Sequence, residues 1–151
     1  MTATLTSTGS TAAVIVTHQR AELLRASLEQ VVHQTHPVQW VVVVDNGAED
    51  AVRELVESMA GDRGVYVPSE TNLGGAGGFA LGFLTALSLG ADAVWCADDD
   101  GRPADHAVLA ELYRVAEANR LHEVSPAVCN INDPGRLAFP LRQGLVWRRR
   151  M

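Results

Sequence analysis

The chain has 151 residues, of which 47% are hydrophobic and 5% aromatic, and its formal net charge is −6 at pH 7. This length suits one domain with a sizeable core, and the acidic balance excludes a general nucleic-acid-binding protein. The two cysteines, Cys96 and Cys129, lack the spacing of a metal or redox motif. Cys96 lies in an apolar run, where we expect a reduced core thiol. Such cysteine usage is typical of a cytoplasmic protein without disulfides.

Residues 1–11 are rich in Thr, Ser, Gly and Ala. They have no basic start and no apolar stretch, so they resemble neither a signal peptide nor an anchor. We expect them to form a disordered tail. No apolar run in the sequence reaches the length that a membrane-spanning helix needs.

Strand and helix patterns alternate over the next hundred residues. Continuous apolar runs predict buried parallel strands over residues 12–17, 40–45, 64–67 and 93–97. Apolar residues spaced three and four apart predict helices over residues 21–34, 49–60, 79–89 and 104–120. The alternation predicts a three-layer α/β/α fold, in which a mainly parallel sheet carries helices on both faces.

Details of the later elements follow from the same pattern. In the third helix we expect Phe83, Leu84 and Leu87 to face the core, and Pro103 suits the first turn of the fourth helix. After Ser125 the pattern is interrupted by prolines, and residues 137–146 are expected to hold one or two short strands. The sheet is therefore expected to be incomplete at its carboxyl-terminal side.

Three consecutive acids, Asp98, Asp99 and Asp100, follow the fourth expected strand. Adjacent carboxylates repel each other, which costs free energy unless a cation offsets it. Carboxylate oxygens suit Mg²⁺ or Mn²⁺, which proteins often share with substrate phosphates. The alternative is a solvated acidic turn that caps the next helix.

Other polar residues follow the first two expected strands. Thr17, His18 and Arg20 come after the first, and Asp45 and Asn46 come after the second. The carboxyl ends of parallel strands share one edge, so these groups should converge with the acids on a ligand site. Asp45 could accept a hydrogen bond from the N3–H of a uracil-like base. Its alternative role is to cap the following helix.

A glycine-rich segment, Asn72–Gly78, precedes the third expected helix as a loop. Within it, Gly75–Ala80 fits the G-x-G-x-x-G/A fingerprint of an NAD(P)-binding oxidoreductase domain, with Asp98 downstream. That fingerprint should follow its strand directly, whereas residues 68–73 intervene here. The other interpretations are close approach of the backbone to a ligand or to a neighbouring helix, and helix–strand packing alone.

Taken in series, four blocks resemble the inverting family-2 glycosyltransferases with the GT-A fold. The blocks are Val14–Arg20, Val43–Gly47, Asn72–Gly78 and Asp98–Asp100, within residues 12–120. The glycine block with its following Phe most resembles bacterial rhamnosyl- and galactofuranosyltransferases, including those of mycobacterial cell-wall galactan synthesis. The resemblance implies inverting transfer of galactofuranose from UDP-galactofuranose to a polyprenyl-diphosphate-linked glycan. The alternative that it implies is rhamnose transfer from a dTDP-sugar.

The resemblance also implies roles for single residues. The loop with Thr17 and Arg20 would contact the nucleoside, Asp45 would bind the base, and the outer acids of the triplet would hold Mn²⁺ or Mg²⁺. Together with the residues at the strand ends, the expected nucleotide-sugar site comprises Thr17, His18, Arg20, Asp45, Asn46, Asn72, Gly74, Gly75, Asp98 and Asp99. The expected metal ligands are Asp98 and Asp100.

By this resemblance, residues 12–125 form the donor-binding half, and residues 126–151 begin a truncated acceptor half. Inversion needs a general base on the opposite face of the sugar, and we expect that base beyond residue 151. Asp133 lies in a Pro-Gly turn, where a structural role is expected. The expected partners are a UDP-sugar and a lipid-linked glycan. Arg148–Arg150 would either be attracted to anionic lipid on the inner face of the plasma membrane or form only a basic surface turn. Exposed apolar sheet surface would favour a homo-oligomer.

Overall fold

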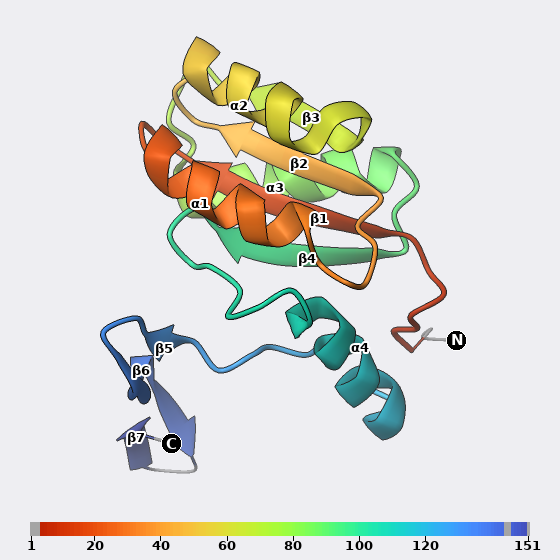
Figure 1. Cartoon of the computed structure of the whole chain (residues 1–151), viewed down its shortest axis with the longest axis vertical. Helices are drawn as coiled ribbons and strands as arrows, with labels where there is room; N and C mark the ends of the chain where they lie inside the picture. The colour runs from red at the N-terminus through yellow and green to blue at the C-terminus, as the bar shows by residue number, and fades with distance from the viewer. Residues whose placement is uncertain (1–3, 144–145, 151) are drawn as a thin grey trace.

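A four-stranded parallel sheet forms the centre of the molecule (Figure 1). The structure, a computed structural model, describes residues 4–143 and 146–150, and side chains as far as residue 140. The strands are β1 (Thr11–Thr17), β2 (Trp40–Asp45), β3 (Gly64–Pro68) and β4 (Ala93–Asp98), in the spatial order β3-β2-β1-β4. β1 therefore lies between β2 and β4, and the expected parallel sheet is confirmed.

Helices cover both faces of this sheet. They are α1 (Ala21–Val32), α2 (Asp50–Ala60) and α3 (Gly74–Ser88), with a short 3-10 turn, η1 (Gly61–Arg63), after α2. The helix α4 (Val108–Asn119) lies below the sheet in Figure 1. Figure 1 shows α1 and α2 in front of the sheet and α3 behind it. The alternating order of strands and helices agrees with the expectation from the sequence.

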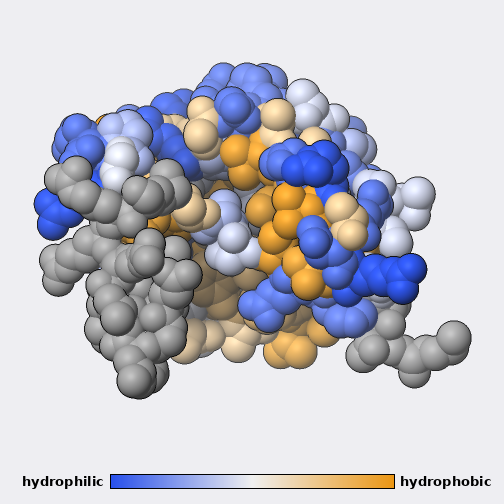
Figure 2. Space-filling model, turned by 90° about the horizontal axis from the view of Figure 1, so that it is seen from below, coloured by the Kyte–Doolittle hydropathy of each residue, from blue (hydrophilic) through white to orange (hydrophobic). Residues whose placement is uncertain are grey.

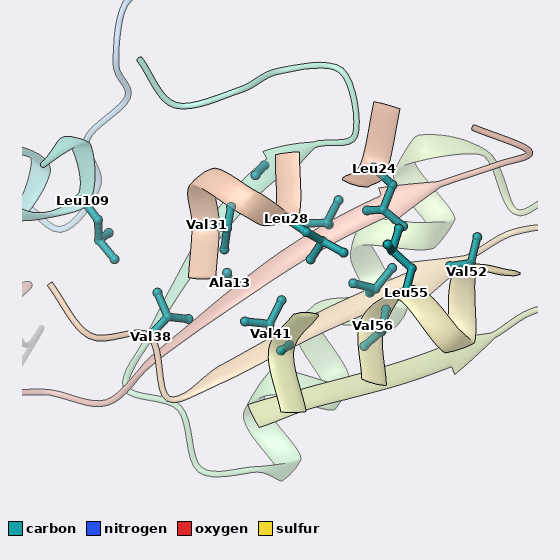
Figure 3. Packing of buried hydrophobic residues seen from close by; sticks show 14 of the residues in the cluster. Ala13, Leu24, Leu28, Val31, Val38, Val41, Val52, Leu55, Val56 and Leu109 are labelled. Atoms are coloured by element: carbon teal, nitrogen blue, oxygen red, sulfur yellow. The ribbon is translucent and has the colours of Figure 1, made fainter. Parts of the chain in front are cut away.

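The larger hydrophobic core lies between the sheet and the helices α1 and α2. Leu24 and Leu28 of α1 meet Leu55 and Val56 of α2 against Val41 of β2 (Figure 3). Full burial of each such side chain stabilises the fold by about 1.5–3 kcal/mol relative to exposure. Successive apolar residues of β1 and β2 point alternately to this core and to a smaller one under α3, so both strands are buried on both faces.

Helix α3 packs on the sheet through its small residues, which corrects the expectation that Phe83, Leu84 and Leu87 face the core. Its buried residues are Gly78, Gly82 and Ala86, whereas Leu84 and Leu87 are 66% and 64% exposed. The reason is steric, because the valines of β1 stand directly under the helix. The glycine-rich segment is also largely helical, since α3 begins at Gly74.

Helix α4 begins at Val108, four residues later than expected, so Pro103 lies before the helix rather than in its first turn. Side-chain acceptors that lie outside the helix fix its start. The side-chain Oε1 of Gln34 accepts a hydrogen bond from the backbone N–H of Leu109 at 2.8 Å. Asp105 accepts one from the N–H of Ala107, also at 2.8 Å. These acceptors replace the proline signal in setting the boundary.

Residues 4–11 are bound to the body of the molecule, which corrects the expected disordered tail. The hydroxyl of Ser7 donates to the Glu117 carboxylate of α4 at 2.7 Å, and that of Ser10 donates to Asp92 at 2.8 Å. Thr11 is the first residue of β1 and is buried. The composition of this segment did not predict an ordered structure, because Ser and Thr residues are typical of disordered segments but can also donate hydrogen bonds to carboxylates.

Asp45 holds the loop that leads from β2 into α2, although it makes no side-chain cap of that helix, whose N-cap residue is Glu49. It is fully buried, and its carboxylate accepts backbone N–H groups from Gly47 at 2.9 Å and from Glu49 at 2.6 Å. The Tyr66 hydroxyl of β3 donates to the same carboxylate at 3.0 Å. Burial, followed by this hydrogen bond, raises the pKa of Tyr66 to about 12. Asp45 therefore joins the end of β2 to β3 and to the start of α2.

A second, antiparallel sheet follows α4. It consists of β5 (Cys129–Asn130), β6 (Asp133–Gln143) and β7 (Val146–Arg150), in the order β5-β6-β7, and lies apart from the parallel sheet (Figure 1). Strands were expected in this region, but β6 begins earlier, at Asp133. The backbone of Arg148–Arg150 belongs to β7, while the side chains of these arginines lie outside the described residues.

Cys96 is exposed rather than buried in the core. It lies in β4, the edge strand beside β1, and α3 lies mainly over β1 and β2. The apolar run around Cys96 therefore has one poorly covered face. In the part of the chain that the structure describes, no helix combines the length and apolar character required to cross a membrane.

The contact of α3 with the sheet predicts that Gly82→Ala will destabilise the chain. A Cβ at Gly82 would overlap the side chain of Val14, and overpacking of this kind costs about 1–3 kcal/mol. Gly75→Ala is the control, because nothing lies within 4 Å of its added Cβ and alanine favours a helix by up to about 1 kcal/mol. Urea unfolding measures both variants, and equal stabilities would contradict the packing described here.

The Asp45 anchor predicts that Tyr66→Phe will destabilise the chain by about 1 kcal/mol at neutral pH, through loss of one hydrogen bond. The pKa of Tyr66 is raised in the folded state, so the stabilisation is complete below pH 10 and is lost as the pH rises towards about 12. Urea unfolding at several alkaline pH values should show the difference from wild type shrinking over this range. The Tyr113→Phe variant identifies the phenolate absorbance of Tyr66, and ionisation near the ordinary pKa would contradict the anchor.

Candidate active site

The acidic triplet lies at the end of β4 and alternates between exposed and buried side chains. Asp98 and Asp100 are exposed, whereas Asp99 is 1% exposed. Asp98 ends β4, and Asp99 and Asp100 lie in the turn that follows, in which the N–H of Gly101 donates to the carbonyl of Asp98 at 3.3 Å. The triplet is therefore divided into an exposed pair, which can bind a cation, and one buried acid with a separate role.

The buried acid is held by residues from the end of β1. Thr17 Oγ1 donates to Asp99 Oδ2 at 2.9 Å, and Arg20 Nε lies 3.1 Å from the same oxygen. Burial is the main influence on Asp99 and raises its pKa, while Thr17 and Arg20 oppose that change. Arg20 Nη1 also contacts Asp100 Oδ2 at 3.1 Å. Arg20 thus bridges the buried acid and one of the exposed ones.

Parallel register brings the ends of the three central strands together. Val16 of β1 pairs with Asp98 of β4, and Thr17 pairs with Asp45 of β2. Ser27 of α1 adds a further tie, since its hydroxyl donates to the backbone carbonyl of Asp98 at 3.1 Å. Ser27 was not among the expected site residues, although a hydroxyl on the apolar face of a helix was a signal for it.

Asn46 fastens the start of α3 to the end of β2. Its amide nitrogen donates to the carbonyl of Gly74 at 3.3 Å, and its Oδ1 accepts the N–H of Leu73, also at 3.3 Å. Asn72 Oδ1 accepts the N–H of Gly74 at 2.8 Å. His18 Nδ1 lies 3.1 Å from the carbonyl of Asn46. These contacts point the amino-terminal end of α3, which favours anions, at the edge of the sheet.

A pocket of about 320 Å³ opens between these groups. It is lined by Val16, Thr17, His18, Arg20, Asn46, Asn72, Gly74, Gly75, Phe79, Asp98, Asp99 and Asp100. The structure thus brings together every expected site residue except Asp45, which is buried as the anchor described above. Val16 and Phe79 were not expected, because apolar residues next to a motif give no signal of their own.

Another cavity, of about 270 Å³, lies at the opposite end of β1 and β4. Thr11, Trp95, Leu109 and Tyr113 are among its lining residues. Figure 2 shows the molecule from below, where apolar residues gather around a central hollow. Parallel α/β sheets bind ligands at the carboxyl ends of their strands, which makes the pocket beside the acidic triplet the candidate active site.

The exposed acids fit a divalent cation that is shared with a ligand. Asp98 and Asp100 supply the hard oxygen donors that Mg²⁺ and Mn²⁺ prefer. Within the described residues, no three His, Cys, Asp or Glu side chains form a complete metal site. The two carboxylates therefore suit a cation whose remaining ligands are phosphate oxygens and water, at the mouth of a pocket that also contains a helix N-terminus.

Comparisons with known proteins agree with this geometry. Residues 12–150 match the family model described as "Glycosyl transferase family 2". The Galactofuranosyltransferase GlfT1 of Mycolicibacterium smegmatis is 57% identical over 145 residues, which cover 96% of this chain and 48% of that protein. The chain spans about half the length of this relative.

Solved structures show the same fold. The mannosyltransferase PcManGT from Pyrobaculum calidifontis, in complex with GDP-Man and Mn²⁺, has a TM-score of 0.57 at 21% identity, over 85% of this chain and 38% of that one. S. aureus TarS 1-349 in complex with UDP has a TM-score of 0.59 at 20% identity, over 72% of this chain and 32% of that one. With a GT-A fold and a family match over nearly its whole length, the chain belongs to glycosyltransferase family 2.

Proposed function

We propose that this chain supplies the nucleotide-sugar site of a metal-dependent, inverting glycosyltransferase of cell-wall synthesis. The donor is UDP-galactofuranose, and the acceptor is a glycan linked to polyprenyl diphosphate. One observation carries the proposal: the strand-end residues and the acidic triplet line a single pocket together with the start of α3. The acids suit a cation, and the helix start suits an anion, which are the two needs of a bound nucleoside diphosphate.

The relatives support the choice of sugar and nucleotide. The 57% identical relative is named a galactofuranosyltransferase, and identity at this level favours a shared donor. TarS binds UDP, and PcManGT binds GDP-Man with Mn²⁺. The proposal of a UDP-sugar and a divalent cation for this chain rests on those names and on the two exposed carboxylates.

In the proposed reaction, Asp98 and Asp100 hold Mn²⁺ or Mg²⁺. When bound, the cation stabilises negative charge on the departing diphosphate. Asn46 and Asn72 position the start of α3 beside the nucleotide, while the loop with Thr17 and Arg20 would contact the nucleoside or diphosphate. The general base that inversion requires is proposed to lie outside these 151 residues.

We also propose where this chain meets its acceptor. A polyprenyl-diphosphate-linked glycan lies at a membrane surface, and the proposed site of action is the cytoplasmic face of the plasma membrane. Arg148–Arg150 would contribute electrostatic attraction to anionic lipid there. This role depends on the sequence alone, because their side chains lie outside the described residues.

Calorimetric titration with UDP tests the nucleotide and metal assignments together. UDP should bind more tightly in the presence of Mn²⁺, and Asp98→Ala or Asp100→Ala should weaken that binding by about tenfold or more, since each removes a charged ligand. Asp50→Ala is the control, because Asp50 is an exposed acid on α2 that pairs only with Arg53 in the described contacts. UDP binding that is independent of Mn²⁺ would contradict the proposed function.

The same titration distinguishes the alternative donors. Tighter binding of dTDP than of UDP would favour rhamnose transfer, and tight NADH binding that survives Asp98→Ala would favour a dinucleotide site. The structure weakens the dinucleotide interpretation, because α3 begins at Gly74 and β3 ends at Pro68, so the glycines do not directly follow their strand. We expect UDP to be the preferred ligand.

A further inference from the structure

Arg20 binds two acids of the triplet that lie in different surroundings. Its Nε contacts Asp99 at 3.1 Å, and its Nη1 contacts Asp100, also at 3.1 Å. The Asp99 side chain is 2% exposed, whereas the side chain of Asp100 is 56% exposed. Exposed ion pairs contribute little free energy and break readily, but a buried carboxylate strongly resists the loss of its partner. One end of the guanidinium is therefore fixed, and the other is free to exchange.

The exchangeable end, Nη1 of Arg20, contacts Asp100, which is a proposed metal ligand. Asp100 cannot keep Arg20 at 3.1 Å and also bind a divalent cation without placing two positive charges close together. The guanidinium therefore competes with the cation for this carboxylate. Arg20 lines the same pocket as the helix start that is proposed to receive the diphosphate, so the released Nη groups would remain in the pocket with that ligand.

We infer that Arg20 is a positioning residue that pairs with Asp100 while no cation is bound there. When the metal binds Asp100, the Nη groups of Arg20 leave this carboxylate and contact the nucleotide's diphosphate instead. This inference rests on the proposed function. The contact between Nε and Asp99 persists as the fixed end of the exchange. Guanidinium groups suit this role because their planar fork binds a carboxylate and a phosphate equally well.

The exchange couples the metal to the nucleotide. Bound alone, the cation must displace Arg20 and leave it beside a second positive charge, so metal binding without nucleotide is disfavoured. When UDP is present, its diphosphate gives the displaced Nη groups a new partner, so each ligand strengthens binding of the other. Because Arg20 opposes one ligand and assists the other, its removal should have opposite effects on the two affinities.

Arg20→Gln tests this prediction against Arg114→Gln. Arg114 is also an exposed arginine, and it pairs with the Glu111 carboxylate on α4, so both variants lose the same charge. Electron paramagnetic resonance measures Mn²⁺ binding without nucleotide, and calorimetry measures UDP binding at saturating Mn²⁺. We expect Arg20→Gln to tighten Mn²⁺ binding about threefold to tenfold and to weaken UDP binding about tenfold. Arg114→Gln should change neither affinity by more than about twofold.

The inference is overturned if Arg20→Gln binds Mn²⁺ no more tightly than Arg114→Gln does, or if it shows no detectable Mn²⁺ binding. A merely structural Arg20 would lower both affinities together. If Arg20→Gln fails to fold by circular dichroism, Arg20→Lys replaces it, because an ammonium group keeps the charge near Asp99 but does not bridge both acids. Failure of the wild-type chain to bind UDP would instead reject the proposed function, while the Mn²⁺ comparison would still decide the role of Arg20.

Discussion

The parallel register of β1 with both of its neighbours is the constraint on which the site depends. Backbone hydrogen bonds place Thr17 beside Asp45 on one side and Val16 beside Asp98 on the other. A slip of one residue would turn the side chains of β1 to the opposite faces of the sheet. Because β1 is buried on both faces, the hydrophobic core enforces the register that the polar residues then use.

The second requirement is the burial of one acid among three. Asp99 is buried, and its contacts with Thr17 and Arg20 offset the free-energy cost of removing its carboxylate from water. Asp98 and Asp100 remain exposed and line the pocket. The contacts of the buried Asp99 side chain hold the backbone of the triplet in place. Adjacent identical residues thus differ in surroundings, because Asp99 is buried in the fold while Asp98 and Asp100 face the pocket.

The sequence predicted the order of elements and most of the residues that line the pocket, because continuous apolar runs and strand-end polar residues are local signals. The face of α3 was predicted wrongly because large apolar residues usually face a core, whereas here Val14 leaves room only for Gly82. The role of Asp45 depended on its distance to the Tyr66 hydroxyl, which joins separate strands and leaves no local pattern. The start of α4 was missed for the same reason, since its acceptor is Gln34 of a distant segment.

The hydrogen bond between Thr17 and Asp99 joins residues that are 82 positions apart. The pocket therefore cannot form until β4 has paired with β1. Contacts of such long range slow folding, since the chain loses much entropy before they reward it. A ligand of this pocket would therefore report on the pairing of β4 with β1 rather than on either strand alone.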